Sequence, residues 1–153
     1  MPYECELLDR PAQAALVIRA VTPVSELPAV LGRAYGAIAQ YMAESGVDPA
    51  GPPFVAYYNV DMQALDIEAG FPVARRVPGR GEIEASEIPG GRSAACMHVG
   101  PYDEVGPAYQ ALSRWIAEHA FTPTGVAYEY FLDDPAEVRP AELRTQVVMP
   151  LRD

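Results

Sequence analysis

The chain contains no lysine, two cysteines, two histidines and no long apolar run. Its 11 basic residues are all arginines and stand against 21 acidic residues, which gives a formal net charge of −10 over 153 residues. A surface that binds nucleic-acid phosphates needs clustered lysine and arginine, so this charge argues against direct binding to DNA or RNA. An acidic surface instead raises the local concentration of small cations.

No apolar stretch reaches the length that spans a bilayer, because Arg19, Arg33 and Gln40 interrupt the alanine-rich segments. The N-terminus carries acidic residues where a signal peptide has a basic region followed by an apolar core. We therefore expect a cytoplasmic protein without a membrane partner. Cys5 and Cys96 are too few for a disulfide framework, and we expect both thiols to be reduced.

The short motifs of metal, phosphate and serine chemistry are missing. The two histidines and two cysteines show neither C-x-x-C nor H-x-x-x-H spacing. No serine stands in a G-x-S-x-G segment, and no glycine cluster opens a helix with phosphate-binding spacing. We predict neither a metal site nor a cofactor.

The sequence repeats itself at a constant difference in residue number. We call this difference the repeat offset, and it relates Pro11 to Pro89. At this offset Pro23 also superposes on Pro101, and Pro72 on Pro150. The predicted elements follow the same order in both halves. We predict an α+β fold of duplicated strand–helix–strand–strand units with pseudo-twofold symmetry and a ligand cleft between the halves. Residues 1–153 then form one domain of two repeats, at about 3–74 and 82–151, with a linker at 75–81.

Alternating and apolar segments predict four strands in each half: 3–9, 14–20, 54–60 and 65–71, then 82–88, 93–99, 126–132 and 144–150. A helix with apolar residues at helical spacing follows the second strand of each half. We expect Ser25 to cap the first helix and Asp103 to open the second. Pro28 and Pro107 fall in the first turns, where proline costs little.

One carboxylate, Glu129, stands in the middle of an otherwise apolar strand. Alternation places it on one face with Phe131, while Tyr128 and Tyr130 point to the other. We infer that the second half has lost six residues before this strand. With this loss taken into account, the repeat aligns Glu129 with Tyr57. Equivalent strands would then bring a carboxylate and a phenol opposite each other across the cleft.

A carboxylate in an aromatic pocket has two uses, and the residues alone do not choose between them. It can pair with a cation that the aromatic faces also attract. Alternatively, desolvation raises its pKa and suits it to general acid or base catalysis near neutrality. A third interpretation of Glu129 is an edge-strand residue whose carboxylate faces water.

Several motifs occur in the order found in a known family: His98-Val99-Gly100-Pro101-Tyr102, Ala108-Tyr109 with Leu112 and Trp115-Ile116, Tyr128-Glu129-Tyr130-Phe131-Leu132-Asp133-Asp134-Pro135 and Glu142-Leu143-Arg144-Thr145, with Gly51-Pro52-Pro53-Phe54 and Gly70-Phe71-Pro72-Val73 in the first half. With them the chain resembles the GyrI-like family over nearly its whole length. That family includes effector-binding domains of AraC- and MerR-type multidrug regulators, stand-alone proteins linked to DNA gyrase inhibition, and hydrolases of cyclopropane-bearing genotoxins.

The resemblance implies a ligand cleft with Glu129 as the pocket glutamate and Tyr57 as the aromatic residue of the first half. Phe131, Tyr102 and Trp115 are the other candidate ligand-binding residues. In an enzyme, Glu129 and Tyr57 would be the catalytic residues. The family pattern commonly has His and Asp after the tyrosine, whereas this chain has Tyr58 and Asn59, a departure that we expect to alter ligand preference.

Three functions stay open at this point. The first is a small-molecule-binding protein for lipophilic aromatic compounds, cationic ones among them, acting in sensing, sequestration, or drug and toxin resistance. The second is a hydrolase of electrophilic cyclopropane-bearing genotoxins that uses the same pocket. The third is a protein–protein module that acts on DNA gyrase. We expect a stand-alone protein without a helix-turn-helix domain, with a small ligand and with a regulator or gyrase as its protein partner.

Overall fold

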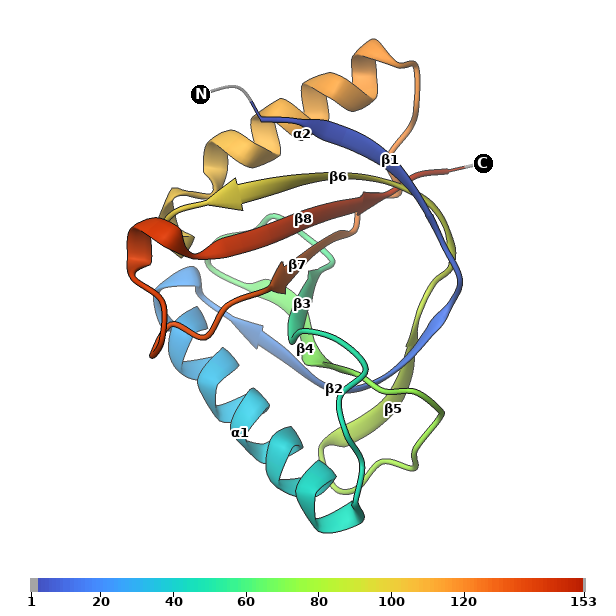
Figure 1. Cartoon of the computed structure of the whole chain (residues 1–153), viewed down its shortest axis with the longest axis vertical. Coiled ribbons are helices and arrows are strands. Elements are labelled where there is room, and N and C mark those ends of the chain that lie inside the picture. Colours follow the sequence, from blue (N-terminus) through green and yellow to red (C-terminus); the bar gives the residue numbers. More distant parts are fainter. Residues whose placement is uncertain (1–2, 153) are drawn as a thin grey trace. The chain divides into compact units, whose positions relative to one another are not determined.

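The computed structural model describes residues 3–152, which form two compact units. The first unit runs from Pro11 to Gly90, and the second combines the segment that ends at Arg10 with the segment that begins at Gly91. Each unit contains four antiparallel strands and one α-helix (Figure 1). The predicted α+β class is confirmed.

The first unit is built from β2 (Gln13–Thr22), α1 (Leu27–Ser45), β3 (Phe54–Tyr57), β4 (Leu65–Pro72) and β5 (Ile83–Ile88). Its strands lie in the order β3-β4-β2-β5. Helix α1 packs on β2 and β4, and its residues Ala34, Ile38 and Met42 are buried in one apolar cluster with Leu16 and Ala69.

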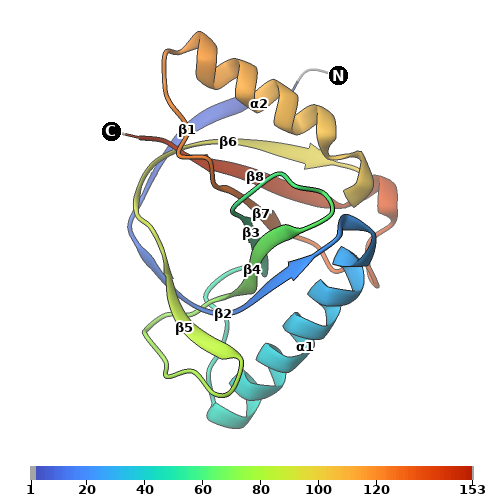
Figure 2. The same cartoon turned by 180° about the vertical axis from the view of Figure 1, so that it is seen from behind.

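The second unit is built from β1 (Cys5–Arg10), β6 (Gly91–Val99), α2 (Gly106–Glu118), β7 (Ala127–Phe131) and β8 (Arg144–Pro150). Its strands lie in the order β1-β6-β8-β7. Helix α2 runs along β6, as Figure 2 shows from the opposite side. The buried residues of this cluster are Ala108, Leu112 and Ile116 of α2 with Ala94, Cys96, Val147 and Leu151.

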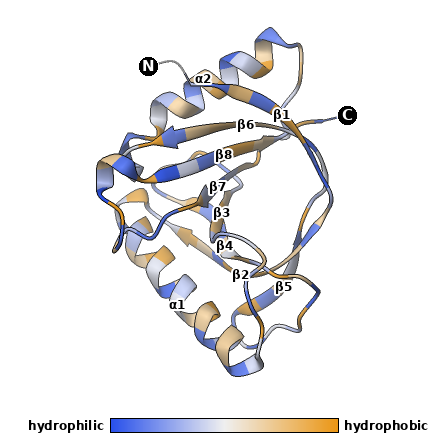
Figure 3. Ribbon diagram, in the orientation of Figure 1, coloured by the Kyte–Doolittle hydropathy of each residue, from blue (hydrophilic) through white to orange (hydrophobic). Residues whose placement is uncertain are grey.

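Both helices are amphipathic, and hydrophilic and hydrophobic residues alternate along them in Figure 3. This spacing turns one apolar stripe of each helix toward the strands. Pro28 and Pro107 lie in the first helical turns, as predicted. Among the residues that the structure describes, no helix combines the length and the apolar character needed to cross a membrane.

A short 3-10 turn precedes each α-helix, η1 at Val24–Glu26 and η2 at Tyr102–Glu104. Ser25 and Asp103 lie inside these turns, so the expectation that they mark the helix starts was wrong. In each unit the tighter 3-10 turn begins at the residue after Pro23 or Pro101. The α-helix therefore begins a few residues later in the sequence than predicted.

The strand registers repeat with the repeat offset. Ala15 pairs with Pro72 in the first unit as Ser93 pairs with Pro150 in the second. The turns η1 and η2 are related by the same offset. The pairing of Ile18 with Ile83 likewise matches that of Cys96 with Cys5. These matching registers support an internal duplication.

The first strand of each repeat pairs with the other repeat. By sequence β1 opens the first repeat and β5 the second, but β1 pairs with β6 and β5 with β2. The compact units therefore depart from the expected repeats 3–74 and 82–151 at these two strands. Residues Pro11 and Ala12 join β1 to β2, and a two-residue hairpin needs positive φ angles that proline cannot adopt. The chain consequently continues into β2 without folding back on β1.

Strands β3 and β7 align at an offset slightly smaller than the repeat offset. Val55 pairs with Ala69 in the first unit, and Glu129 pairs with Val147 in the second. Ala69 and Val147 are related by the repeat offset, so Val55 is the structural equivalent of Glu129. The expected alignment of Glu129 with Tyr57 was wrong by two residues, because the second repeat has lost four residues before this strand, not six.

Candidate functional site

One face of β6, β8 and β7 carries polar side chains beneath α2. Directly paired residues of antiparallel strands lie side by side on the same face. One such row consists of His98, Thr145 and Phe131, and the next consists of Cys96, Val147 and Glu129. Helix α2 packs against this face through the cluster that contains Cys96 and Val147. Glu129 and its neighbours therefore lie on the face of the strands against which α2 packs.

Glu129 is 7% exposed, so the interpretation that its carboxylate faces water was wrong. Tyr109 in the first turn of α2 donates a hydrogen bond to Glu129 Oε2 at 2.5 Å. Burial raises the pKa of Glu129, and the hydrogen bond from Tyr109 and the nearby His98 oppose that rise. The site thus holds a desolvated carboxyl group whose hydrogen bond comes from a neutral phenol.

His98 is buried and both of its ring nitrogens have partners. Nε2 lies 3.0 Å from the carbonyl oxygen of Pro101, which can only accept, so Nε2 carries the hydrogen and donates it. Nδ1 lies 3.2 Å from the hydroxyl of Tyr3, which donates to it when the ring is neutral. Gly100, with φ of 140°, makes the turn between His98 and Pro101. His98 is therefore a fixed part of the frame around the site.

Thr145 lies between His98 and Phe131 and is 1% exposed. Its Oγ1 has no hydrogen-bond partner within residues 3–152. The large majority of buried side-chain polar atoms in proteins have at least one partner. This hydroxyl is therefore a polar group to which a bound molecule can supply the missing hydrogen bond.

Phe131 and Tyr102 form an aromatic pair at the end of the Thr145 row. Their ring centroids lie 5.2 Å apart with an edge-to-face angle of 64°. Phe131 is half-buried, while Tyr102 in η2 is 36% exposed. Burial raises the pKa of the Tyr102 hydroxyl, and the carboxylates of Asp133 and Asp134 add to that effect. Exposure thus decreases from Tyr102 through Phe131 to Thr145, which marks the side open to solvent.

The remaining two predicted ligand residues lie elsewhere. Trp115, near the C-terminal end of α2, stacks on His119 with ring centroids 4.1 Å apart and on Phe121 at 6.2 Å. It borders the apolar cluster beneath that end of the helix. Tyr57 is half-buried at the end of β3 in the first unit. A role for Trp115 or Tyr57 in binding stays a prediction.

Tyr58 and Asn59, where the chain departs from the family pattern, support the connection between β3 and β4. The Asn59 side chain donates to the Ala64 carbonyl at 2.9 Å and accepts from the Asp66 amide at 3.0 Å. Tyr58 donates to the carboxylate of Glu68, and the Arg19 guanidinium lies 5.2 Å from the centre of its ring. Both residues thus have structural contacts within the first unit.

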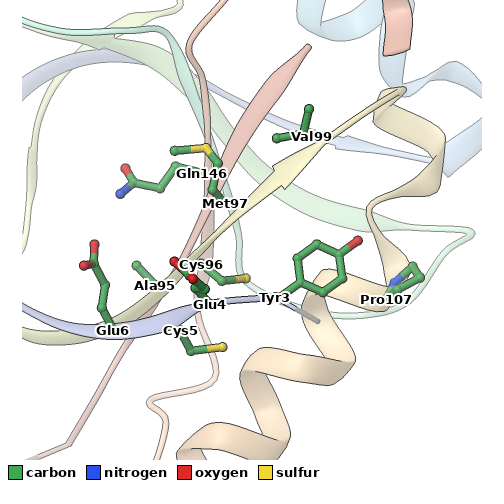
Figure 4. Close-up of a pocket in the computed structure, with 10 residues that line it drawn as sticks. All are labelled: Tyr3, Glu4, Cys5, Glu6, Ala95, Cys96, Met97, Val99, Pro107 and Gln146. Carbon is green, nitrogen blue, oxygen red and sulfur yellow. The ribbon is translucent and has the colours of Figure 1, made fainter. Parts of the chain in front are cut away.

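A hollow of about 870 Å³ lies along β1 and β6 (Figure 4). Its lining consists of Tyr3, Glu4, Cys5, Glu6, Ala95, Cys96, Met97, Val99, Pro107 and Gln146. Cys5 and Cys96 are direct partners in the strand register and both are free thiols. Burial raises the pKa of Cys96 to about 12, so this thiol stays protonated and unreactive at neutral pH. The hollow offers two surface carboxylates but no activated nucleophile.

Sequence reasoning did not select Tyr109, His98 or Thr145 as site residues. Tyr109 stands one turn before Leu112 on the buried stripe of its helix, a position that indicates contact with the strands beneath. His98 and Thr145 are far apart in sequence, and only the register of β6 against β8 brings them together. The repeat offset relates this register to that of β2 against β4, but it does not reveal which strands pair.

The chain was compared with known families and solved structures. The model of the GyrI-like small molecule binding domain matches residues 3–152. The crystal structure of the EcmrR C-terminal domain is similar at 22% identity and a TM-score of 0.89, with 100% of this chain and 99% of that chain covered. In EcmrR bound to DNA the identity is 22% and the TM-score 0.87, and this chain spans 59% of the longer one.

Two further similar structures have other descriptions. A hydrolase from Listeria innocua is 15% identical, with a TM-score of 0.69, and 99% of this chain and 94% of that chain are covered. SAV2435 bound to tetraphenylphosphonium is 10% identical with a TM-score of 0.66 and the same coverage of both chains. No curated protein matches the sequence. The solved structures establish the fold, and the family match over residues 3–152 shows that the chain belongs to the GyrI-like small molecule binding domain family.

Proposed function

We propose that this protein binds lipophilic aromatic cations through the carboxylate of Glu129. One observation carries the proposal: within residues 3–152 the buried Glu129 has a phenol as its hydrogen-bond donor and no arginine in an ion pair with it. Burying a charged carboxylate without a counter-charge is costly. A cationic ligand supplies the counter-charge, and the free energy of that pairing favours binding.

The surroundings of Glu129 suit an aromatic cation. Phe131 and Tyr102 offer ring faces and edges at the more exposed end of the site, where cation–π attraction is worth roughly 0.5–2 kcal/mol. The formal net charge of −10 attracts cations over longer distances. A protein of the same fold, SAV2435, has been solved with the lipophilic cation tetraphenylphosphonium.

Such binding serves either sensing or sequestration of a toxic compound. The likeness to the C-terminal domain of EcmrR, a protein solved on DNA, favours sensing on behalf of a regulator. Sequestration and resistance require only that the ligand is held. Both roles depend on the same contact with Glu129.

Calorimetric titration tests the proposal with tetraphenylphosphonium and the neutral triphenylphosphine oxide as probes. Glu129→Gln should weaken phosphonium binding tenfold or more, because a charge-assisted contact is worth about 1.5–3 kcal/mol. The neutral probe should lose much less. Glu137→Gln removes the same charge from an exposed position and serves as the matched control, with a change of at most about twofold expected.

Equal losses for the charged and the neutral probe would contradict recognition of charge by Glu129. A pH series adds a second readout, since tetraphenylphosphonium does not titrate. The pKa of Glu129 is raised, so phosphonium affinity should increase with pH through a midpoint above that of an ordinary glutamate. A flat profile in the wild type would also contradict the proposal.

A second candidate function is hydrolysis of an electrophilic small molecule such as a cyclopropane-bearing genotoxin. The raised pKa of Glu129 favours it, because a general base works best when its pKa lies near the operating pH. In this scheme Glu129 takes a proton from water while the water oxygen attacks the strained carbon. The ring bond breaks, and its electron pair passes to the electron-withdrawing group of the substrate, which is then protonated. Tyr57 keeps its predicted role of polarising the substrate.

Turnover distinguishes the two functions. With the compound in large excess, an enzyme consumes many equivalents and loses this activity in Glu129→Gln, whereas a binding protein protects one equivalent. Consumption at the same background rate by wild type and variant would exclude hydrolysis of that compound class. Binding without consumption leaves the first candidate intact.

A further inference from the structure

The unpartnered hydroxyl of Thr145 is a second polar group of the same site. It lies on β8 beneath α2, with His98 beside it on β6 and Phe131 beside it on β7. Neither neighbour serves it, because both ring nitrogens of His98 have other partners and Phe131 is apolar. An unpaired buried hydroxyl disfavours the folded state, so its presence requires a reason outside the packing.

The first unit shows that the fold does not need this hydroxyl. Ile67 occupies the equivalent position at the repeat offset, and it pairs with Ala20 and Tyr57 as Thr145 pairs with His98 and Phe131. Ile67 is fully buried. A β-branched apolar side chain therefore fills the same place on the same scaffold, and the hydroxyl in the second unit is an addition to it.

Thr145 is close to Glu129. Glu129 pairs with Val147, two residues along β8 from Thr145 on the same face, so the two polar residues are diagonal neighbours. A nitrogen that donates two hydrogen bonds of about 2.9 Å in tetrahedral directions joins oxygen atoms about 4.7 Å apart. The flexible Glu129 side chain and the short Thr145 side chain suit such a bridge.

We propose that Thr145 Oγ1 accepts a hydrogen bond from a protonated amine whose other N–H is bound by Glu129. This inference rests on the proposed function and refines it: the site selects primary and secondary ammonium ions over quaternary ammonium and phosphonium ions, which have no N–H. The apolar substituent of the amine packs against Phe131 and Tyr102 on the open side. Thr145 is thus the specificity-determining residue, and Glu129 supplies the charge.

The test uses two cations with one skeleton, dibenzylammonium and dibenzyldimethylammonium, in titrations at pH 7. Thr145→Val replaces the hydroxyl by a methyl group, and it should lower the affinity ratio of the secondary to the quaternary ion about tenfold. Thr145→Ser keeps the hydroxyl and should keep the ratio. Thr22→Val is the matched control, because Thr22 is equally buried in the first unit but donates to the Pro23 carbonyl at 3.0 Å.

An unchanged ratio in Thr145→Val overturns the inference. If Glu129→Gln weakens neither ion, the proposed function itself fails, so the two failures are distinguishable. The melting temperature of Thr145→Val should equal or exceed that of the wild type, whereas Thr22→Val loses a hydrogen bond and should melt lower. Should Thr145→Val not fold, Thr145→Ala gives the same ratio, with Thr145→Ser as its reference.

Discussion

The two units share strand registers but differ in the chemistry of the face beneath the helix. At the position of Glu129 the first unit has Val55, which is fully buried. At the position of His98 it has Ala20, and at that of Thr145 it has Ile67. The first unit is apolar at each position where the second carries a polar side chain.

A tyrosine shows how one contact changes between the copies. Tyr35 of α1 donates to the backbone carbonyl of Phe54 at 2.8 Å, while Tyr109 of α2 donates to the Glu129 carboxylate. The two tyrosines are separated by the same offset that relates Val55 to Glu129. The scaffold thus needs a phenol at this place, and the second unit has redirected it to a side chain. The proposed site thus differs from the equivalent place in the first unit by a few substitutions in one of two copies.

The largest effect is expected when a carboxylate is introduced at the equivalent position of the first unit. Val55→Glu should destabilise the protein by about 3–5 kcal/mol, because it buries a charge without a prepared partner. The reverse change, Glu129→Val, should leave stability equal or higher while cation binding is lost. Urea unfolding followed by circular dichroism measures both, and equal destabilisation by the two variants would contradict a functional role for Glu129.

The pH dependence of stability sharpens the same contrast. The raised pKa means that the folded state binds the Glu129 proton more tightly than the unfolded state, so wild-type stability falls as pH rises from the ordinary glutamate pKa to the raised value. Glutamine does not titrate. The stability advantage of Glu129→Gln should therefore grow across this window, in urea unfolding at several pH values. An advantage that is largest at acid pH would have the wrong sign.

Removing the hydroxyl from each tyrosine separates structure from function with a smaller effect. Tyr35→Phe should lower stability by about 1 kcal/mol and leave cation binding unchanged. Tyr109→Phe removes a hydrogen bond that lowers the pKa of Glu129, so the pH midpoint of tetraphenylphosphonium binding should move up. A midpoint that moves in Tyr35→Phe instead would refute the assignment of these contacts.

The smallest expected effect concerns the cysteines, whose equivalents in the first unit are Ile83 and Ile18. Because the pKa of Cys96 is about 12, iodoacetamide at pH 8 should leave Cys96 unmodified in the folded protein and modify it in urea. Mass spectrometry of peptides from both conditions gives the extent. Rapid modification of Cys96 in the native protein would mean that its side of the apolar cluster opens.

The sequence was sufficient to predict the fold class, the repeat offset and the presence of a glutamate among apolar neighbours in the last third of the chain. Prolines mark the ends of strands, so their superposition located equivalent strands before any pairing was known. Alternation then singled out Glu129, since one carboxylate among apolar neighbours is visible in the sequence.

What the sequence could not provide was the pairing of distant segments. The alignment of Glu129 with Tyr57 depended on a count of residues lost in a loop, and loops vary in length without changing the strands that they join. Thr145 does not stand out in its own strand, because threonine is common in strands. What distinguishes it is a buried hydroxyl without a partner within residues 3–152, which the sequence does not show.

Because strands β1 and β5 each pair with the other repeat, we expect the two fragments to stay associated after proteolytic cleavage between the repeats. Arg75 and Arg76 are exposed in the segment between the repeats, where trypsin can cleave. The N-terminal fragment would then keep β1, which pairs in the second unit, while the C-terminal fragment would keep β5, which pairs in the first. Each fragment therefore contributes one strand to the sheet formed by the other. The two fragments can dissociate only if these strand pairings break. A single repeat on its own could complete its sheet only with the first strand of a second copy. The tandem chain is therefore equivalent to a strand-swapped dimer whose two subunits are joined by one peptide linker.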